Sequence, residues 1–169
     1  MIALLILAVS MPMLFASSQE EAVGEVKNPD TFVYVSYGTV DSLDPAKAYD
    51  NASGGCIQNM NETLIAFKGE STTEFVPVLA EEVPTVENGG ILDGGKTYRF
   101  KIRKGVKFHS GNPLTPEDVK YSFLRAMVVD PPGGPTWLIS FPLLGTYSSR
   151  EGSEIVADFA AMDAAIYVE

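Results

Sequence analysis

Residues 97–103 constrain the fold of this chain more than any other segment. Tyr98, Phe100 and Ile102 alternate there with Thr, Lys and Arg, and a period of two places the two kinds of side chain on opposite faces of an extended strand. The basic face is most simply a solvated face whose cations blunt the edge of a sheet. A second short strand is expected at residues 106–108, so the chain needs a sheet.

A strong helix start follows this strand region. Thr115 is a good N-cap, Pro116 suits the first helical position, and Glu117 and Asp118 complement the positive end of the helix dipole. The run Asp-Pro-Pro-Gly-Gly-Pro at residues 130–135 cannot continue a helix. We therefore expect a helix that ends near residue 129 and buries one apolar face, formed by Val119, Phe123, Ala126 and Met127.

Weaker patterns predict the remaining elements of a mixed α/β fold. Aromatic and β-branched residues at 32–37 indicate a strand, and residues 46–55 an open loop. Apolar residues at four-residue steps predict a helix from Cys56 to about Phe67. Residues 75–82 are crossed by a proline, which favours an edge or irregular segment, and residues 156–166 are expected to be helical.

Composition excludes several classes of function. The 169 residues are 46% apolar, enough for the core of one domain, and the formal charge is −10. That charge argues against nucleic-acid binding and against docking on anionic lipid. One Cys and one His exclude an intramolecular disulfide, a Cys-rich zinc site and a multi-His metal site, and the lone His argues against a hydrolase triad.

The first residues have the character of an export signal. Residues 2–9 are apolar and uncharged, apolar character continues to Phe15, and the small residues 16–18 precede an acidic stretch. We predict a signal peptide at 1–18 and a linker at 19–31; a buried core helix is the alternative. No cysteine stands directly after the apolar run, and Cys56 is far downstream, so lipid anchoring through it is not expected. That thiol is expected to be free and buried. The predicted location is periplasmic or at the cell surface.

No catalytic pattern is present in the sequence. Neighbouring acids, such as those at 81–82, point apart along one element, and the paired glycines at 89–90 and 94–95 lack a phosphate-loop pattern. His109 lies among polar residues in a turn and is expected to be an ordinary surface histidine. We therefore expect a binding module rather than an enzyme, with no cofactor and no metal.

Four segments, in order, carry a resemblance: residues 32–45, which end in Leu-Asp-Pro; 61–64, Asn-Glu-Thr-Leu; 75–81, which contain Pro-Val-Leu-Ala-Glu; and 93–111 with its continuation at 113–123. Together they resemble the extracytoplasmic solute-binding proteins of family 5, the dipeptide- and oligopeptide-binding type that serves ABC transporters for peptides, nickel and oligosaccharides. The resemblance implies a two-lobed Venus-flytrap fold of the type II periplasmic-binding-protein kind. Residues 32–169 are then expected to be the N-terminal part of lobe I, with the second lobe absent and the chain a fragment.

The resemblance also implies a function and a site. The function is capture of a small ligand, peptide first and oligosaccharide or nickel chelate next, for delivery to ABC permease subunits by a protein that is monomeric at full length and binds no nucleic acid. The region behind the first strand faces the cleft in the family, which makes Tyr37, Gly38, Thr39 and Ser42 candidate ligand contacts. Trp137, with Tyr37 and Tyr49, offers stacking surface; ordinary packing is the alternative for each ring.

Three other functions remain open from the sequence: an exported enzyme whose catalytic half is missing, a small structural or interaction protein that is complete as written, and a truncated remnant that binds nothing.

Overall fold

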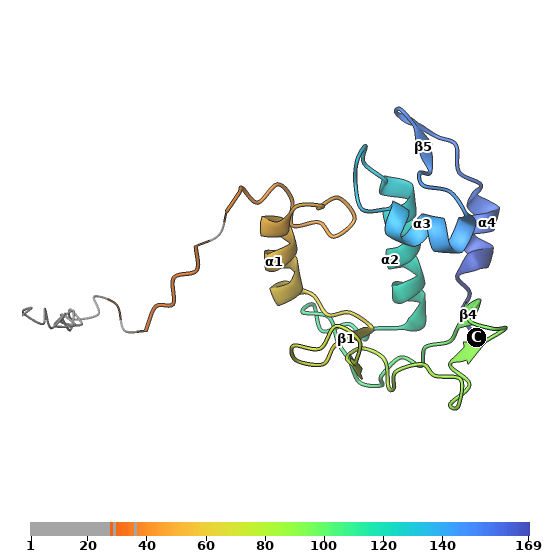
Figure 1. Ribbon diagram of the computed structural model, residues 1–169, viewed down its shortest axis with the longest axis horizontal. Coiled ribbons are helices and arrows are strands. Elements are labelled where there is room, and N and C mark those ends of the chain that lie inside the picture. The colour runs from red at the N-terminus through yellow and green to blue at the C-terminus, as the bar shows by residue number, and fades with distance from the viewer. Residues whose placement is uncertain (1–27, 29, 36) are drawn as a thin grey trace, which may run out of the picture. The chain divides into compact units, whose positions relative to one another are not determined.

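A computed structural model describes residues 28, 30–35 and 37–169 of the chain (Figure 1). The expected signal peptide at 1–18 and nearly all of the linker at 19–31 lie outside the described residues. The chain divides into two compact units, residues 1–35 and 36–169. All helices and strands described below belong to the second unit.

The second unit mixes helices with short strands, which confirms the mixed α/β fold class. In chain order the elements are α1 (Asn51–Met60), β1 (Ile65–Phe67), β2 (Phe75–Pro77), β3 (Ile91–Leu92), β4 (Thr97–Tyr98), α2 (Pro116–Val129), α3 (Trp137–Leu144), β5 (Arg150–Glu151), β6 (Glu154–Ile155) and α4 (Phe159–Ala165).

The strands form three separate antiparallel pairs among the described residues, β1 with β2, β3 with β4 and β5 with β6. In the first pair Ala66 lies opposite Val76, and the rings of Phe67 and Phe75 stack with centroids 4.9 Å apart. Pro77 ends β2 at a sheet edge, as its missing N–H predicts.

The long strand predicted at 97–103 is only partly formed. Regular pairing stops after β4, and the chain then makes an isolated bridge from Ile102 to Ala80. The backbone N–H of Arg103 donates to the carbonyl of Leu79 at 2.8 Å, so the segment stays extended. The predicted alternation is confirmed over most of its length, because Phe100 and Ile102 are half-buried while the basic residues between and beside them are exposed.

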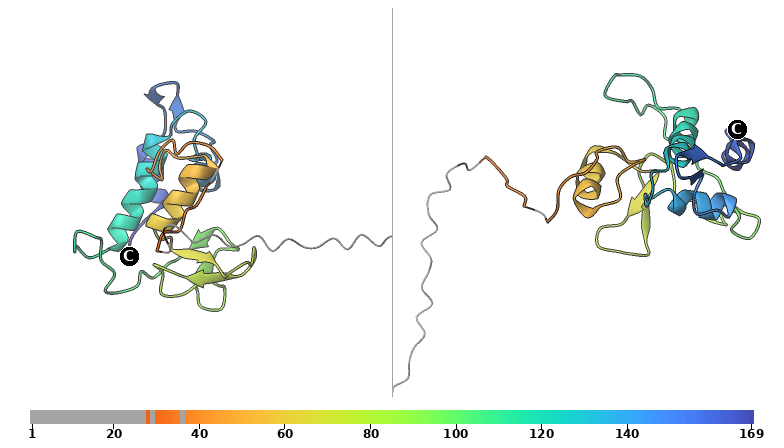
Figure 2. Two further views of the ribbon diagram at one scale, coloured as in Figure 1. Left: turned by 90° about the vertical axis from the view of Figure 1, so that its left-hand side faces the viewer. Right: turned by 90° about the horizontal axis from the view of Figure 1, so that it is seen from above.

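Helix α2 begins where the sequence predicts. The backbone N–H of Thr115 donates to Asp118 Oδ2 at 2.8 Å, and the Thr115 hydroxyl donates to the same oxygen at 2.9 Å. Met127 is fully buried, and the rest of the predicted face is half-buried. Helices α2, α3 and α4 contact one another (Figures 1 and 2), so the core of this unit lies between them.

The helix predicted from Cys56 to Phe67 is wrong in its bounds. Helix α1 begins five residues earlier, inside the segment predicted to be an open loop, and β1 occupies the end of the predicted helix. The cause is Asp50, which accepts a hydrogen bond from the backbone N–H of Ser53 at 2.8 Å and so caps the helix. Cys56 therefore lies within α1, and it is exposed rather than buried as predicted.

The strand predicted at 32–37 is also wrong. Residues 32–35 and Tyr37 belong to no strand, and the side chains of Phe32 and Val35 are 89% and 85% exposed. A strand requires a ladder of hydrogen bonds to a partner. None of the described residues pairs with this segment, so high β-propensity alone does not make it a strand.

Helices α3 and α4 differ in part from what the sequence predicts. The apolar segment after Thr136 forms α3 in spite of Pro142, and α3 ends at Gly145, whose φ of 73° is left-handed. Helix α4 begins at Phe159, later than expected, because Asp158 caps it by accepting hydrogen bonds from Ala160 and Ala161. No helix among the described residues is long and apolar enough to cross a membrane.

Candidate functional site

The loop at residues 37–49 carries most of the candidate ligand contacts. Tyr37 is 99% exposed, and Gly38 and Thr39 are exposed beside it. Gly38 has a φ of 91°, a left-handed conformation that a side chain would disfavour. Ser42 is half-buried. Three anchors fix this loop on the helices.

The first anchor is Ser53 of α1. Its side chain is fully buried, and its Oγ accepts hydrogen bonds from the backbone N–H groups of Asp41 at 3.0 Å and Ser42 at 3.2 Å. The Ser42 hydroxyl in turn accepts a hydrogen bond from the N–H of Asp44 at 3.1 Å. Two successive backbone amides of the loop are therefore satisfied by one buried hydroxyl, which sets the position of Ser42.

The second anchor joins the loop to α2. Arg125 donates two hydrogen bonds to Asp44, from Nη1 to Oδ1 at 2.7 Å and from Nη2 to Oδ2 at 2.6 Å. The Arg125 hydrogen bond lowers the pKa of Asp44 from its ordinary value of 3.8 to about 2. This bidentate geometry is the most directional form of ion pair, and it fixes the Leu-Asp-Pro turn against the helix.

The third anchor joins two aromatic candidates. The indole Nε1–H of Trp137, at the start of α3, donates to the hydroxyl oxygen of Tyr49 at 3.1 Å. The two residues are 38% and 55% exposed, so both rings retain accessible surface. Within the described part of the chain, no hydrogen bond joins Trp137 to Gly38, Thr39 or Ser42, which lie at the other end of the loop.

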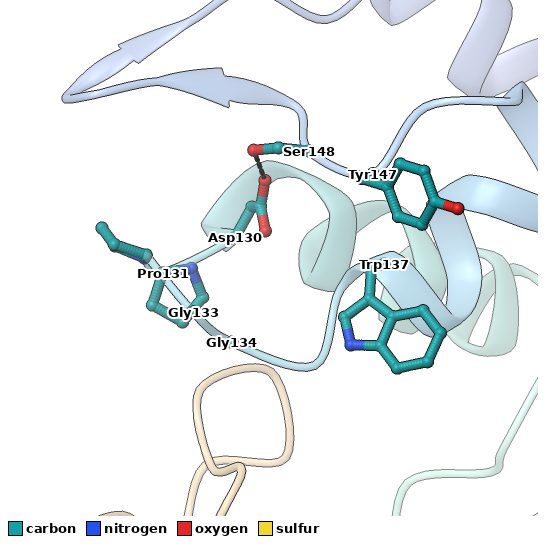
Figure 3. A pocket seen from close by; sticks show the side chains of 8 residues that line it. Asp130, Pro131, Gly133, Gly134, Trp137, Tyr147 and Ser148 are labelled. Atoms are coloured by element: carbon teal, nitrogen blue, oxygen red, sulfur yellow. Dashed lines mark hydrogen bonds between the residues drawn. The ribbon is translucent and has the colours of Figure 1, made fainter.

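An open hollow of about 390 Å³ lies beside Trp137 (Figure 3). Trp137 and Tyr147 lie at one end of it, and Asp130 and Ser148 lie at the other. Its remaining lining comes from the backbone and prolines of residues 131–134. The sequence predicted only a non-helical turn at 130–135, because nothing local to that turn indicates that Tyr147 and Ser148 return to it.

Asp130 is the charged group of this hollow. It is only 6% exposed, and its Oδ2 accepts hydrogen bonds from the Ser148 hydroxyl at 2.6 Å, the Ser149 N–H at 2.7 Å and the Ser149 hydroxyl at 3.1 Å. Burial raises the pKa of Asp130, but the hydrogen bonds from Ser148 and Ser149 outweigh it and hold the pKa below its ordinary value. The hollow is therefore bounded by an ionised carboxylate.

The surroundings of Asp130 also close the C-terminal end of α2. Arg150 donates from Nη2 to the carbonyl of Val128 at 2.8 Å and from Nε to that of Val129 at 3.1 Å. The Ser149 hydroxyl donates to the carbonyl of Met127, and the Thr136 hydroxyl donates to that of Ala126 at 3.1 Å. These donors satisfy the last carbonyls of the helix, so this cluster has a structural role.

The site offers recognition chemistry. Its groups are two aromatic faces, loop amides and hydroxyls, and a buried carboxylate, which suit a ligand held by stacking and hydrogen bonds. Within residues 30–35 and 37–169, no group of three or more His, Cys, Asp or Glu side chains is placed to hold a metal ion. The acids at 81–82 and the lone His109 are exposed, as expected.

Comparison with known proteins identifies relatives of this chain. It is 35% identical over 86 residues to the oligopeptide-binding protein OppA of Bacillus subtilis, covering 51% of this chain and 14% of that protein. It is 35% identical over 106 residues to the dipeptide-binding protein of Escherichia coli, covering 56% and 18%. A third relative, the probable deoxycholate-binding periplasmic protein YgiS of Escherichia coli, is 35% identical over 100 residues, covering 59% and 17%.

The chain thus spans about a sixth of the length of these relatives. No solved structure matches it. The family model described as bacterial extracellular solute-binding proteins, family 5 Middle, matches residues 74–164. Because this match covers more than half of the chain, the protein belongs to the bacterial extracellular solute-binding proteins of family 5.

Proposed function

We propose that this chain is part of the substrate-binding component of an ABC importer, and that its ligands are peptides captured outside the cytoplasmic membrane. Membership of the family supports a binding role, and two of the relatives described above are named as peptide-binding proteins. The apolar, uncharged start of the chain supports export. Delivery of the ligand to permease subunits completes the proposed role.

The observation that carries this proposal is the anchored loop at 37–49. Ser53, Arg125 and Trp137 hold it at three places, while Tyr37, Gly38 and Thr39 remain exposed at its start. A loop fixed in this way presents its polar groups with little ordering cost on binding. These polar groups can form hydrogen bonds with the backbone amides of an extended peptide.

The aromatic end of the site supports the same ligand class. Trp137 offers an apolar face, and Tyr49 holds its orientation through the indole N–H. The ionised Asp130 disfavours anionic groups in the adjacent hollow. We assign Tyr37, Gly38, Thr39 and Ser42 to polar contacts with the ligand and Trp137 to stacking. In this mechanism the ligand stabilises a closed state and no covalent bond is made or broken.

Trp137 is the only tryptophan of the chain, so intrinsic fluorescence reports directly on the proposed site. We expect a saturable shift of this emission when the protein is titrated with alanyl-phenylalanine or trialanine. The variant Thr39→Val, which removes an exposed hydroxyl from the loop, should bind more weakly, whereas Thr72→Val, at an exposed position outside the site, should bind as the parent protein does.

Other ligands separate the alternatives. A fluorescence shift with maltotriose or a nickel–histidine chelate, and none with peptides, would show that the protein binds an oligosaccharide or a nickel chelate instead. Absence of a shift with every one of these compounds would mean that this chain does not bind solute and would refute the proposal.

A further inference from the structure

Half of the basic residues of this acidic protein lie in one short segment. Residues 96–107 contain six of its twelve Lys and Arg and no Asp or Glu. All six side chains are exposed. We call these residues the cationic stripe: Lys96, Arg99, Lys101, Arg103, Lys104 and Lys107.

The backbone places three of these cations on one face. Arg99, Lys101 and Arg103 alternate with half-buried residues along an extended segment, and the carbonyl of Lys101 accepts a hydrogen bond from the N–H of Glu81 at 2.8 Å. The side chains of alternate residues on such a segment point the same way. Lys104 and Lys107 follow on either side of a turn at Gly105, where φ is 80°.

Most of the stripe is not neutralised by neighbouring acids. Arg99 lies 3.3 Å from Glu169 and Lys101 lies 3.6 Å from Glu82, and both pairs are exposed, so they contribute little. The other four cations form no ion pair with any residue that the structure describes. They therefore remain available to an anionic partner.

The composition of the stripe favours a lipid surface over an acidic protein. Four of the six cations are Lys, a residue that is depleted in protein–protein interfaces. The Lys ammonium group is attracted to mobile headgroup phosphates and needs no fixed geometry for this attraction. Two exposed aromatic rings neighbour the cations in the sequence, Tyr98 at 59% and Phe108 at 46% exposed. Tyr98 alternates with the cations along the strand and lies on its other face, so the cations alone carry the assignment.

The net charge of −10 does not exclude this partner. Exposed charges are screened beyond about 8 Å at physiological ionic strength. A membrane that meets the stripe therefore responds mainly to the local cations rather than to acids on distant faces. The net charge describes the whole chain, whereas residues 96–107 carry six cations and no acid.

We propose that the cationic stripe docks the protein on anionic phospholipid headgroups. This role is independent of solute capture, because none of the six cations belongs to the loop at 37–49 or to the hollow beside Trp137. The surface would hold the protein beside the bilayer in which a permease lies.

Sedimentation with vesicles tests this assignment. The full chain is mixed with phosphatidylcholine vesicles that contain roughly 30% phosphatidylglycerol, and with pure phosphatidylcholine vesicles, at about 0.1 M and about 0.5 M salt. We expect binding to the anionic vesicles at low salt only. Because each cation contributes about fivefold to partitioning, Lys104→Gln with Lys107→Gln should weaken binding about 25-fold.

A matched double variant separates the stripe from charge in general. Lys47→Gln with Lys68→Gln removes the same charge from exposed positions elsewhere and should leave binding within about twofold of the parent, since neither residue lies in the stripe. Equal weakening by both doubles, or equal binding to neutral and anionic vesicles, would overturn the proposal. Binding to soluble polyglutamate without affinity for vesicles would also overturn it and would assign the stripe to an acidic protein.

Discussion

Asp44 and Asp130 each precede a proline, and their carboxylates stabilise different parts of this molecule through different kinds of interaction. Both carboxylates have a lowered pKa and both are hydrogen-bonded across the chain. Asp130 is nearly inaccessible and accepts from hydroxyls and an amide of Ser148 and Ser149, all of them neutral donors. Asp44 is 25% exposed as a side chain and is paired with the guanidinium of Arg125.

The difference shows how one residue type serves stability in one place and positioning in another. Asp130 lies at the end of α2 and satisfies neutral donors, so its contribution depends on burial and is nearly independent of salt. Asp44 fixes a surface loop through an ion pair, whose strength depends on pH and ionic strength. Substitutions at and around the two aspartates should therefore lower the free energy of unfolding by different amounts, and these amounts should depend differently on pH and salt.

Asp130→Ala should have the largest effect. It removes the acceptor of the Ser149 N–H and one of the two acceptors of each serine hydroxyl, and we expect the free energy of unfolding to fall by about 3 kcal/mol. The loss should be the same at about 0.05 M and about 0.5 M NaCl, because no cation pairs with this carboxylate among the described residues. Urea unfolding measures both quantities.

Asp163→Ala is the control for that prediction. Asp163 is 66% exposed and pairs with Lys120 at 2.7 Å, so its removal should cost less than about 0.5 kcal/mol. An equal loss for the two aspartates would show that burial does not set the size of the effect, and the comparison would fail.

Ser53→Ala should have the second largest effect, and it tests the loop that contains Asp44. Ser53 is fully buried, and its Oγ accepts from the amides of Asp41 and Ser42. Removing it should lower the free energy of unfolding by about 2 kcal/mol. Ser122→Ala, which removes an exposed hydroxyl bound to the carbonyl of Asp118 at 2.9 Å, should cost less than about 0.5 kcal/mol in the same assay.

Peptide titration adds a second readout to Ser53→Ala. If the loop is the proposed site, the variant should also weaken the Trp137 fluorescence response, while Ser122→Ala should not. Unchanged affinity in a destabilised Ser53→Ala protein would separate the loop from ligand binding.

Arg125→Met tests the ion pair at Asp44 and should lower the free energy of unfolding at neutral pH by less than Ser53→Ala does, because both partners are partly exposed. The pKa of Asp44 is lowered from 3.8 to about 2. A depressed folded-state pKa stabilises the fold above the unfolded pKa and loses that contribution as pH falls through the folded pKa.

The parent protein should therefore lose stability between about pH 4 and about pH 2 more steeply than Arg125→Met does. Urea midpoints across this range measure the difference, with Lys68→Met, which breaks an exposed pair with Glu74, as the control. Parallel pH profiles for the parent and Arg125→Met would contradict the role of this pair.

The parts of the fold that were predictable from sequence are those with local causes. Helix α2 was predicted at both ends because Thr115, Pro116 and Asp118 act within one turn and the Pro-Gly run stops it. Helix α1 was missed although its cap is also local. The four-residue apolar period favours a start at Cys56, whereas the helix begins at the Asp50 cap, five residues before the first residue of that period. The strand at 32–37 failed because pairing depends on a partner elsewhere.

The site was predictable only in its residue types. Tyr49 and Trp137 could be suggested as aromatic surface, but their contact spans 88 residues. The pair Asp44–Arg125 spans 81 residues, and neither residue alone indicates it. Asp130 was explained by its turn, and its burial against Ser148 and Ser149 depends on the return of the chain after α3. Long-range polar contacts of this kind leave no periodic signal in the sequence.

Tyr49→Phe should have the smallest effect on stability and the most specific effect on the site. It removes the acceptor of the Trp137 indole N–H, and because both rings are partly exposed, water replaces that acceptor at a cost of about 0.5 kcal/mol. The loop keeps its anchors at Ser53 and Arg125, so only Trp137 and the Tyr49 end of the loop gain freedom. The titration with alanyl-phenylalanine should then show weaker binding at nearly unchanged stability, whereas Tyr98→Phe, in the cationic stripe region, should bind as the parent does. Unaltered binding in Tyr49→Phe would mean that the orientation of Trp137 does not contribute to recognition. The proposed site would then be limited to the exposed start of the loop at Tyr37, Gly38 and Thr39.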